Sequence, residues 1–108
     1  MATTTETNVL VNKSATIFNA TVVSSAIAAA FDLGLLDQIH HEETVSVREF
    51  CQRNDLHYES VHAILLVLQS EQIVRLDPER DFVSADELFQ QIFLDKGYFE
   101  WLVGGYGT

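Results

Sequence analysis

The feature that most constrains this chain is an uncharged, mostly apolar segment that covers residues 14–31. Apolar side chains recur along it at three- and four-residue spacing, which predicts a helix. The positions that carry this pattern are Phe18, Val22, Ala26, Ala29 and Leu33. The segment is short and polar for a membrane span, which needs about 20 predominantly apolar residues. We therefore expect a long helix that is buried on most of its sides, because it is apolar on most of its sides.

A second face of this helix carries the small residues Ala20, Ser24 and Ala28, four positions apart. Such a face lets another helix approach closely. A domain of 108 residues has few residues of its own with which to surround a helix. A second subunit is the simplest cover, so we expect an intertwined homodimer. The candidates for the dimer interface are Phe18, Val22, Ser24 and Ala28.

The sequence before the predicted helix and the residue after it indicate where the helix begins and ends. Residues 1–13 are expected to form a flexible arm, because the Thr-rich start of the chain has little to pack. Residues 1–8 contain Glu6 and no basic residue, whereas a secretory signal begins with a positively charged segment. At the other side, Gly34 is expected to cap the helix C-terminus.

The next part of the chain predicts a helix-turn-helix followed by a hairpin. Ser46 and Glu49 form a Ser-x-x-Glu capping box at the start of a short helix that reaches about Arg53. A second helix is expected over residues 57–71. Strand candidates at 73–76 and 81–84 flank a Pro-containing turn, and together they predict a hairpin wing.

After the wing, Ser84 and Glu87 look like a second capping box that starts another helix. Lys96 and Gly97 are expected to break it. The predicted fold is mainly α, a winged-helix-like dimerisation domain over residues 14–96 with a small β-hairpin wing. Residues 97–108 are expected to begin an aromatic linker helix toward a catalytic domain that this sequence does not contain.

The charge balance bears on the possible partners. Six Lys and Arg residues against sixteen Asp and Glu give a formal net charge of −10, which repels nucleic acid and anionic membranes. The second helix of the helix-turn-helix, at residues 57–71, contains neither Lys nor Arg. We therefore expect no nucleic-acid or membrane partner. A winged-helix transcriptional regulator or ligand sensor is the alternative interpretation.

The sequence offers little for catalysis or metal binding. Cys51 has no second cysteine to pair with, which fits a reducing cytoplasm, and it is expected to be a packed, inert thiol. The four histidines lack the spacing of a metal site. No catalytic, cofactor-binding or metal-binding residue is assigned.

Two stretches carry a resemblance to a known family. Residues 29–37 form an Ala-rich helix end that leads through Leu33-Gly34-Leu35 to Asp37, and residues 65–68, Leu-Leu-Val-Leu, lead into Ile73-Val74. In this order they resemble the N-terminal domain of class I S-adenosylmethionine-dependent O-methyltransferases. These enzymes modify small molecules in plants and in bacterial antibiotic pathways.

The resemblance implies a role in assembly and substrate covering. In that family a Rossmann-like domain binds S-adenosylmethionine, and this sequence lacks its Gly-rich strand-turn-helix signature. The chain alone is therefore expected to be inactive and to hold no cofactor. The parent protein is expected to methylate a secondary metabolite. The candidates for the substrate pocket are Phe18, Trp101 and Tyr106.

Overall fold

The structure is a computed structural model that describes the backbone of residues 2–100 and the side chains of residues 13–99. It is mainly helical, with a small open antiparallel sheet, as the sequence predicts. The helices are α1 (Ala2–Asp32), α2 (Leu35–Glu42), α3 (Val47–Arg53), α4 (Tyr58–Ser70), α5 (Phe89–Leu94) and α6 (Lys96–Glu100). The strands are β1 (Thr44–Ser46), β2 (Val74–Asp77) and β3 (Phe82–Ala85).

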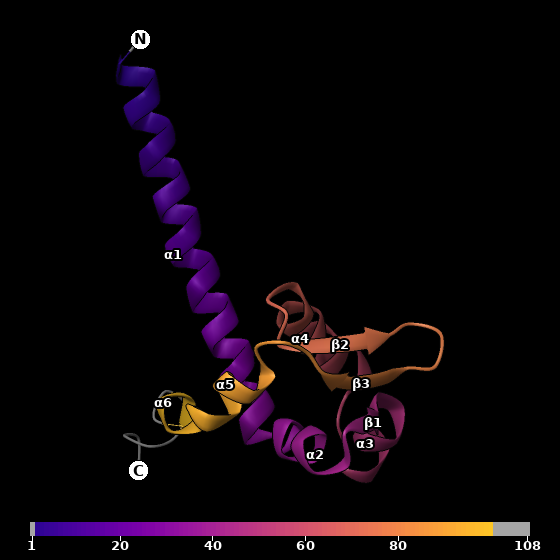
Figure 1. The fold of residues 1–108 in the computed structure, drawn as a ribbon. Helices are drawn as coiled ribbons and strands as arrows, with labels where there is room; N and C mark the ends of the chain where they lie inside the picture. The colour runs from indigo at the N-terminus through magenta and orange to yellow at the C-terminus, as the bar shows by residue number, and fades with distance from the viewer. Residues whose placement is uncertain (1, 101–108) are drawn as a thin grey trace.

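Helix α1 dominates the shape of the molecule. Its 31 residues span about 46 Å at 1.5 Å per residue, and most of this length extends away from the other elements (Figure 1). Its C-terminal end enters the body, where it packs against α4 and α6. Gly34 ends the helix in a left-handed conformation, with φ 79°, and its amide donates to the Phe31 carbonyl at 3.0 Å. The predicted cap at Gly34 is confirmed.

Helix α1 begins earlier in the chain than the sequence predicted. We expected a flexible arm over residues 1–13, and the backbone is helical from Ala2 onward. The physical reason is cooperativity: once a helix is nucleated, each added residue gains a hydrogen bond for the ordering of one residue. Thr lowers helix propensity by only a few tenths of a kcal/mol, roughly, so a run of Thr does not end a helix.

The core lies where the C-terminal end of α1 meets α2, α3, α4 and the sheet. The largest side chains with less than 2% exposure are Phe50, Leu35, Leu36, Ile39, Leu65, Leu68, Ile73, Val45, Val47, Val74 and Val83. They come from every element between α2 and β3. The body is therefore one hydrophobic core, and α1 joins it through its last turns.

Local caps set the start of the two middle helices. The Ser46 hydroxyl accepts a hydrogen bond from the Glu49 amide at 3.3 Å, so the Ser46 cap of α3 is confirmed. His57 caps α4 in the same way, because its Nδ1 accepts from the Ser60 amide at 3.3 Å. These caps satisfy amides that have no partner inside the helix.

The sheet contains one strand more than the sequence predicted. β2 and β3 form the expected hairpin wing, and β1 pairs with the free edge of β3 to give the order β1-β3-β2. Val45 in β1 lies opposite Val83 in β3, and both side chains are buried. β1 has three residues, which is too short to show the period-two pattern of a strand.

The second capping box is wrong. Ser84 lies in β3, where its backbone pairs with Thr44 and Arg75. α5 begins at Phe89, and its N-cap, Leu88, makes no side-chain hydrogen bond. β3 continues through Ala85 and α5 begins only at Phe89, so no helix amide lies two or three residues after Ser84 for its hydroxyl to cap. The predicted break falls between α5 and α6 at Asp95, one residue before Lys96.

Candidate functional site

The exposed part of α1 is the first candidate surface. Ile17, Phe18 and Val22 are 60%, 67% and 38% exposed, although all three are large apolar side chains. Neighbouring apolar side chains on a soluble protein are rarely left open to water in this number unless they meet something. The prediction that α1 is buried on most sides therefore fails within a single chain. We call Ile17, Phe18 and Val22 the α1 apolar face.

The four candidates for the dimer interface divide along the helix. Phe18 and Val22 lie on the exposed part of α1, and Ser24 is half-buried. Ala28 is 3% exposed within the single chain. Its side chain is therefore already covered by residues of its own chain.

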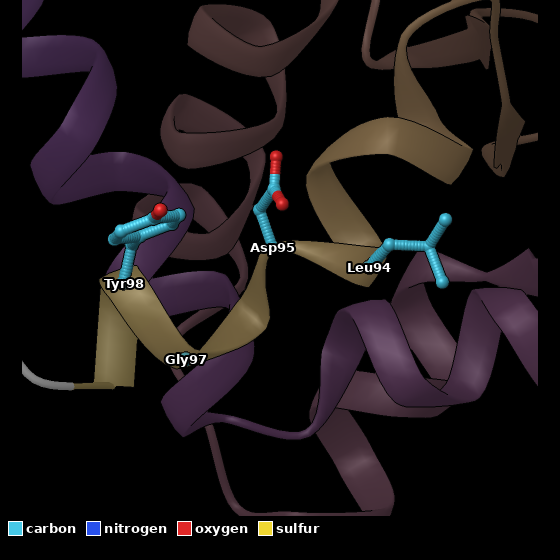
Figure 2. A pocket seen from close by; sticks show the side chains of 4 residues that line it. All are labelled: Leu94, Asp95, Gly97 and Tyr98. Carbon is cyan, nitrogen blue, oxygen red and sulfur yellow. The ribbon is translucent and has the colours of Figure 1, made fainter.

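The second candidate surface is a hollow of about 450 Å³ beside α5 and α6. Leu94, Asp95, Gly97 and Tyr98 line it, and Figure 2 shows Leu94 and Tyr98 on either side of the turn that joins the two helices. Leu94 is 73% exposed and Tyr98 75% exposed. An apolar and an aromatic side chain thus stand open to water at this hollow.

Aromatic contacts fix the position of this hollow against α1. The ring of Phe31 lies 6.0 Å from that of Phe99 and 6.2 Å from that of Phe93, between ring centres. Lys96 lies over the Phe31 ring at 5.7 Å and donates to Asp37 at 3.2 Å. Phe93 is half-buried, and Phe89, which is 3% exposed, belongs to the core. The contacts of Phe99 and Lys96 with the Phe31 ring therefore hold α6 against the end of α1, and the ion pair with Asp37 joins it to α2.

Of the three substrate-pocket candidates, Phe18 alone lies within the described residues. Phe18 is exposed on α1, whereas the hollow lies at α5 and α6. Trp101 and Tyr106 lie outside the described residues. Tyr98 and Leu94 were not among the candidates. The sequence marked neither residue, because an apolar residue near a helix end or an aromatic residue after a Gly can be either buried or exposed.

Cys51 is placed as a structural thiol. Its side chain is 4% exposed. Burial raises its pKa above the usual value, the charge of Asp81 raises it further, and Arg48 lowers it. A raised pKa keeps the thiol protonated, and the thiolate is the nucleophilic form. Among residues 13–99, no group of three His, Cys, Asp or Glu side chains is placed to hold a metal ion.

A cluster around Asp81 was missed by the sequence. The Tyr58 hydroxyl donates to Asp81 Oδ1 at 2.6 Å, and the Arg48 guanidinium lies 4.7 Å from the centre of the Tyr58 ring. The hydrogen bond to Asp81 is the main cause that raises the pKa of Tyr58. The other carboxylate oxygen of Asp81, Oδ2, is buried without a hydrogen-bond partner. These residues lie 23 positions apart in the chain, so no local pattern joins Tyr58 to Asp81.

Residues Lys13–Asp32 of α1 are long and apolar enough to cross a membrane. We had expected this segment to be too short and too polar for a membrane span. A buried helix of a soluble protein meets the same criteria. The last turns of this segment lie in the core, where Ala26, Ile27, Ala30 and Phe31 are buried. The length of the helix is therefore weak support for a membrane role.

Comparison with known proteins relates this chain to part of a methyltransferase. No family model matches the chain. It is 36% identical over 93 residues to Methyltransferase ungE' of Aspergillus campestris (strain IBT 28561). The match covers 86% of this chain and 27% of that protein, so the chain spans about a quarter of the length of the relative. The chain is thus related to a segment of a methyltransferase.

Proposed function

We propose that this chain is the dimerisation and substrate-cap domain of an S-adenosylmethionine-dependent methyltransferase that acts on a small secondary metabolite. The observation that carries the proposal is the α1 apolar face, exposed on a helix that extends away from the core. The catalytic chemistry belongs to a Rossmann-like domain that this sequence does not contain. The domain described here assembles the enzyme and closes over the substrate.

The relationship to a methyltransferase supports the assignment of assembly to this chain and of catalysis to a separate domain. The matched segment is 27% of the relative, which leaves room there for a separate catalytic domain. Cofactor binding in a Rossmann-like fold needs a Gly-rich turn between a strand and a helix. In the described part of this chain the strands belong to one small antiparallel sheet, and Gly34 follows a helix. S-adenosylmethionine is therefore assigned to the other domain.

The exposed apolar surface supports assembly through α1. Complete burial of a Phe or Ile side chain stabilises a protein by about 1.5–3 kcal/mol. In a symmetric dimer the α1 apolar face occurs twice, so the interface would cover six large apolar side chains, three from each chain. This gain must exceed the loss of translational and rotational freedom on association.

The hollow at α5 and α6 supports a role in covering substrate. Leu94 and Tyr98 present an apolar side chain and an aromatic ring with a polar hydroxyl at an open surface. Small-molecule pockets are mostly apolar with a few polar groups that fix orientation. Trp101 and Tyr106 remain the proposed additions to this wall from the segment after α6, whereas Phe18 is assigned to the α1 apolar face.

A DNA-reading role has less support. α3, α4 and the β2–β3 hairpin follow the order of a winged helix, but α4 carries Glu59 and no Lys or Arg. DNA binding depends on basic side chains that neutralise phosphates. With a net charge of −10, the chain would be repelled from the DNA backbone.

Phe18→Glu tests the proposal at its central residue. A charge in the middle of the α1 apolar face should weaken dimerisation by more than the loss of the Phe18 contact alone. The reason is that a buried unpaired carboxylate is strongly unfavourable. Sedimentation velocity should show a dimer for the unmodified chain and a monomer for Phe18→Glu. Circular dichroism should show the same helix content for both.

Gln52→Glu is the matched control. Gln52 is exposed on α3, and its substitution adds the same negative charge away from α1. This variant should remain a dimer. A Phe18→Glu protein that sediments as a dimer would remove Phe18 from the interface and with it the main support for assembly through this face.

A further inference from the structure

A groove runs between α4 and the β2–β3 hairpin, on a side of the molecule that the proposed function does not use. It encloses about 370 Å³. From α4 it is lined by Tyr58, His62 and Leu66, which are spaced four residues apart and so share one face of the helix. From the hairpin it is lined by Leu76, Asp77 and Asp81. We call it the helix–wing groove.

The wall of the groove is apolar and partly aromatic. Leu66 is 48% exposed and Leu76 is half-buried. The rings of Tyr58 and His62 stack with 5.6 Å between their centres and 22° between their planes. Leu66 does not belong to the core, so its exposure makes apolar surface available in the groove. A flat apolar molecule could bury this surface.

The hairpin side of the groove is acidic. Asp77 Oδ1 accepts hydrogen bonds from the Glu79 and Arg80 amides at 3.1 and 3.3 Å, and the residue is exposed. Asp81 adds a second carboxylate, whose Oδ2 is buried without a hydrogen-bond partner. A carboxylate oxygen that no donor satisfies leaves its negative charge undercompensated, and a nearby cation lowers the energy of such a site.

The balance of charge around the groove favours a cation. Arg48 lies 4.7 Å from the centre of the Tyr58 ring, where its charge acts on the Tyr58 hydroxyl in the opposite direction to that of Asp81. Two carboxylates against this one guanidinium leave an excess of negative charge in a protein that carries −10 overall. A negative protein field attracts cations toward an acidic cleft and repels anions from it.

We infer that the helix–wing groove binds a small protonated amine whose apolar body is about the size of an aromatic ring. The ammonium group lies against Asp77, in the field of Asp81, and the apolar body lies on Leu66, Leu76 and the His62 ring. The volume falls within the range of about 300–1,000 Å³ that is usual for small-molecule pockets. This site is independent of the assembly role, because none of its described lining residues lies on α1, α5 or α6.

The probe for this site is 2-phenylethylamine, titrated into the 108-residue chain and followed by two-dimensional amide NMR. Saturable shifts should cluster at residues 58–69 and 76–81. Asp77→Asn should weaken binding about tenfold, because it removes the charge from the ammonium contact. The variant keeps the turn, since an Asn side-chain oxygen accepts the same backbone hydrogen bonds. Glu79→Gln removes the same charge from the same turn outside the groove and should leave binding unchanged.

The neutral analogue 2-phenylethanol distinguishes a cation site from an apolar one. It should bind at least about tenfold more weakly than the amine if the carboxylates recognise the charge. Equal binding of the alcohol would overturn the inference. So would shifts outside the groove, equal effects of Asp77→Asn and Glu79→Gln, or no saturation by about 10 mM amine.

Discussion

Asp81 joins three parts of the fold through one residue. Its amide donates to the Asp77 carbonyl at 2.9 Å and closes the hairpin turn, while its carbonyl accepts from the Val47 amide at 3.0 Å at the start of α3. Its side chain accepts from Tyr58 at the start of α4. Asp81 has φ 60°, a left-handed conformation that Asp tolerates better than most residues. The position of the wing relative to the helices therefore depends on this residue.

Tyr58→Phe should destabilise the fold by about 1 kcal/mol, because it removes one charge-assisted hydrogen bond from a half-buried site. Chemical denaturation in urea measures the change. Tyr98→Phe is the control, since Tyr98 is 75% exposed, and it should stay within about 0.5 kcal/mol of the unmodified chain. Equal stability of the Tyr58 variant and the unmodified chain would show that the contact to Asp81 contributes nothing.

The same contact predicts a pH dependence. The hydrogen bond to Asp81 raises the pKa of Tyr58 in the folded state above the usual value of 10.0. A raised pKa stabilises the fold below the unfolded-state pKa, and this contribution is lost as the pH rises through the folded-state pKa. The stability difference between the unmodified chain and Tyr58→Phe should be constant from about pH 6 to 9 and shrink above about pH 10. A difference that grows with pH would contradict the assignment.

At the scale of elements, Ser46 and Ser84 separate a real cap from an apparent one. Both begin a sequence that looks like the start of a helix, but Ser46 caps α3 and Ser84 pairs in β3. Ser46→Ala should cost about 1 kcal/mol, because the Glu49 amide loses its partner. Ser84→Ala should cost clearly less, since no helix amide depends on its hydroxyl. Thermal unfolding of the two variants measures both, and equal losses would refute the distinction.

The sequence predicted the elements whose signals are local. The periodic apolar positions located α1 and α4, the turn around Pro78 located the hairpin, and Gly34 and Ser46 marked a helix end and a helix start. β1 was missed because its three residues become a strand only by pairing with β3. The second capping box failed for the same reason, since tertiary pairing overrode a local preference.

The candidate sites were less accessible to prediction than the fold. The dimer candidates follow a helical pattern, but a pattern cannot show that Ala28 is covered by the chain itself while Phe18 is exposed. Tyr58 and Asp81 meet only after α4 and the hairpin have packed. Residues of this kind become visible only when distant parts of the chain are placed together.

At the scale of the whole molecule, the architecture is a compact body with one long projecting helix (Figure 1). The body buries its own apolar side chains, while the α1 apolar face stays open. The high net negative charge keeps such a protein soluble but gives no cover to an apolar surface. In the proposed dimer, α1 of the second chain covers this apolar face.

The most direct test of assembly through α1 is the molar mass of the unmodified chain by light scattering coupled to size exclusion, over a dilution series. We expect a mass close to twice the 12.1 kDa of one chain, kept down to about 1 μM. A folded protein that stays at 12.1 kDa across the series would rule out assembly through α1, because α1 would then expose its apolar face without a partner.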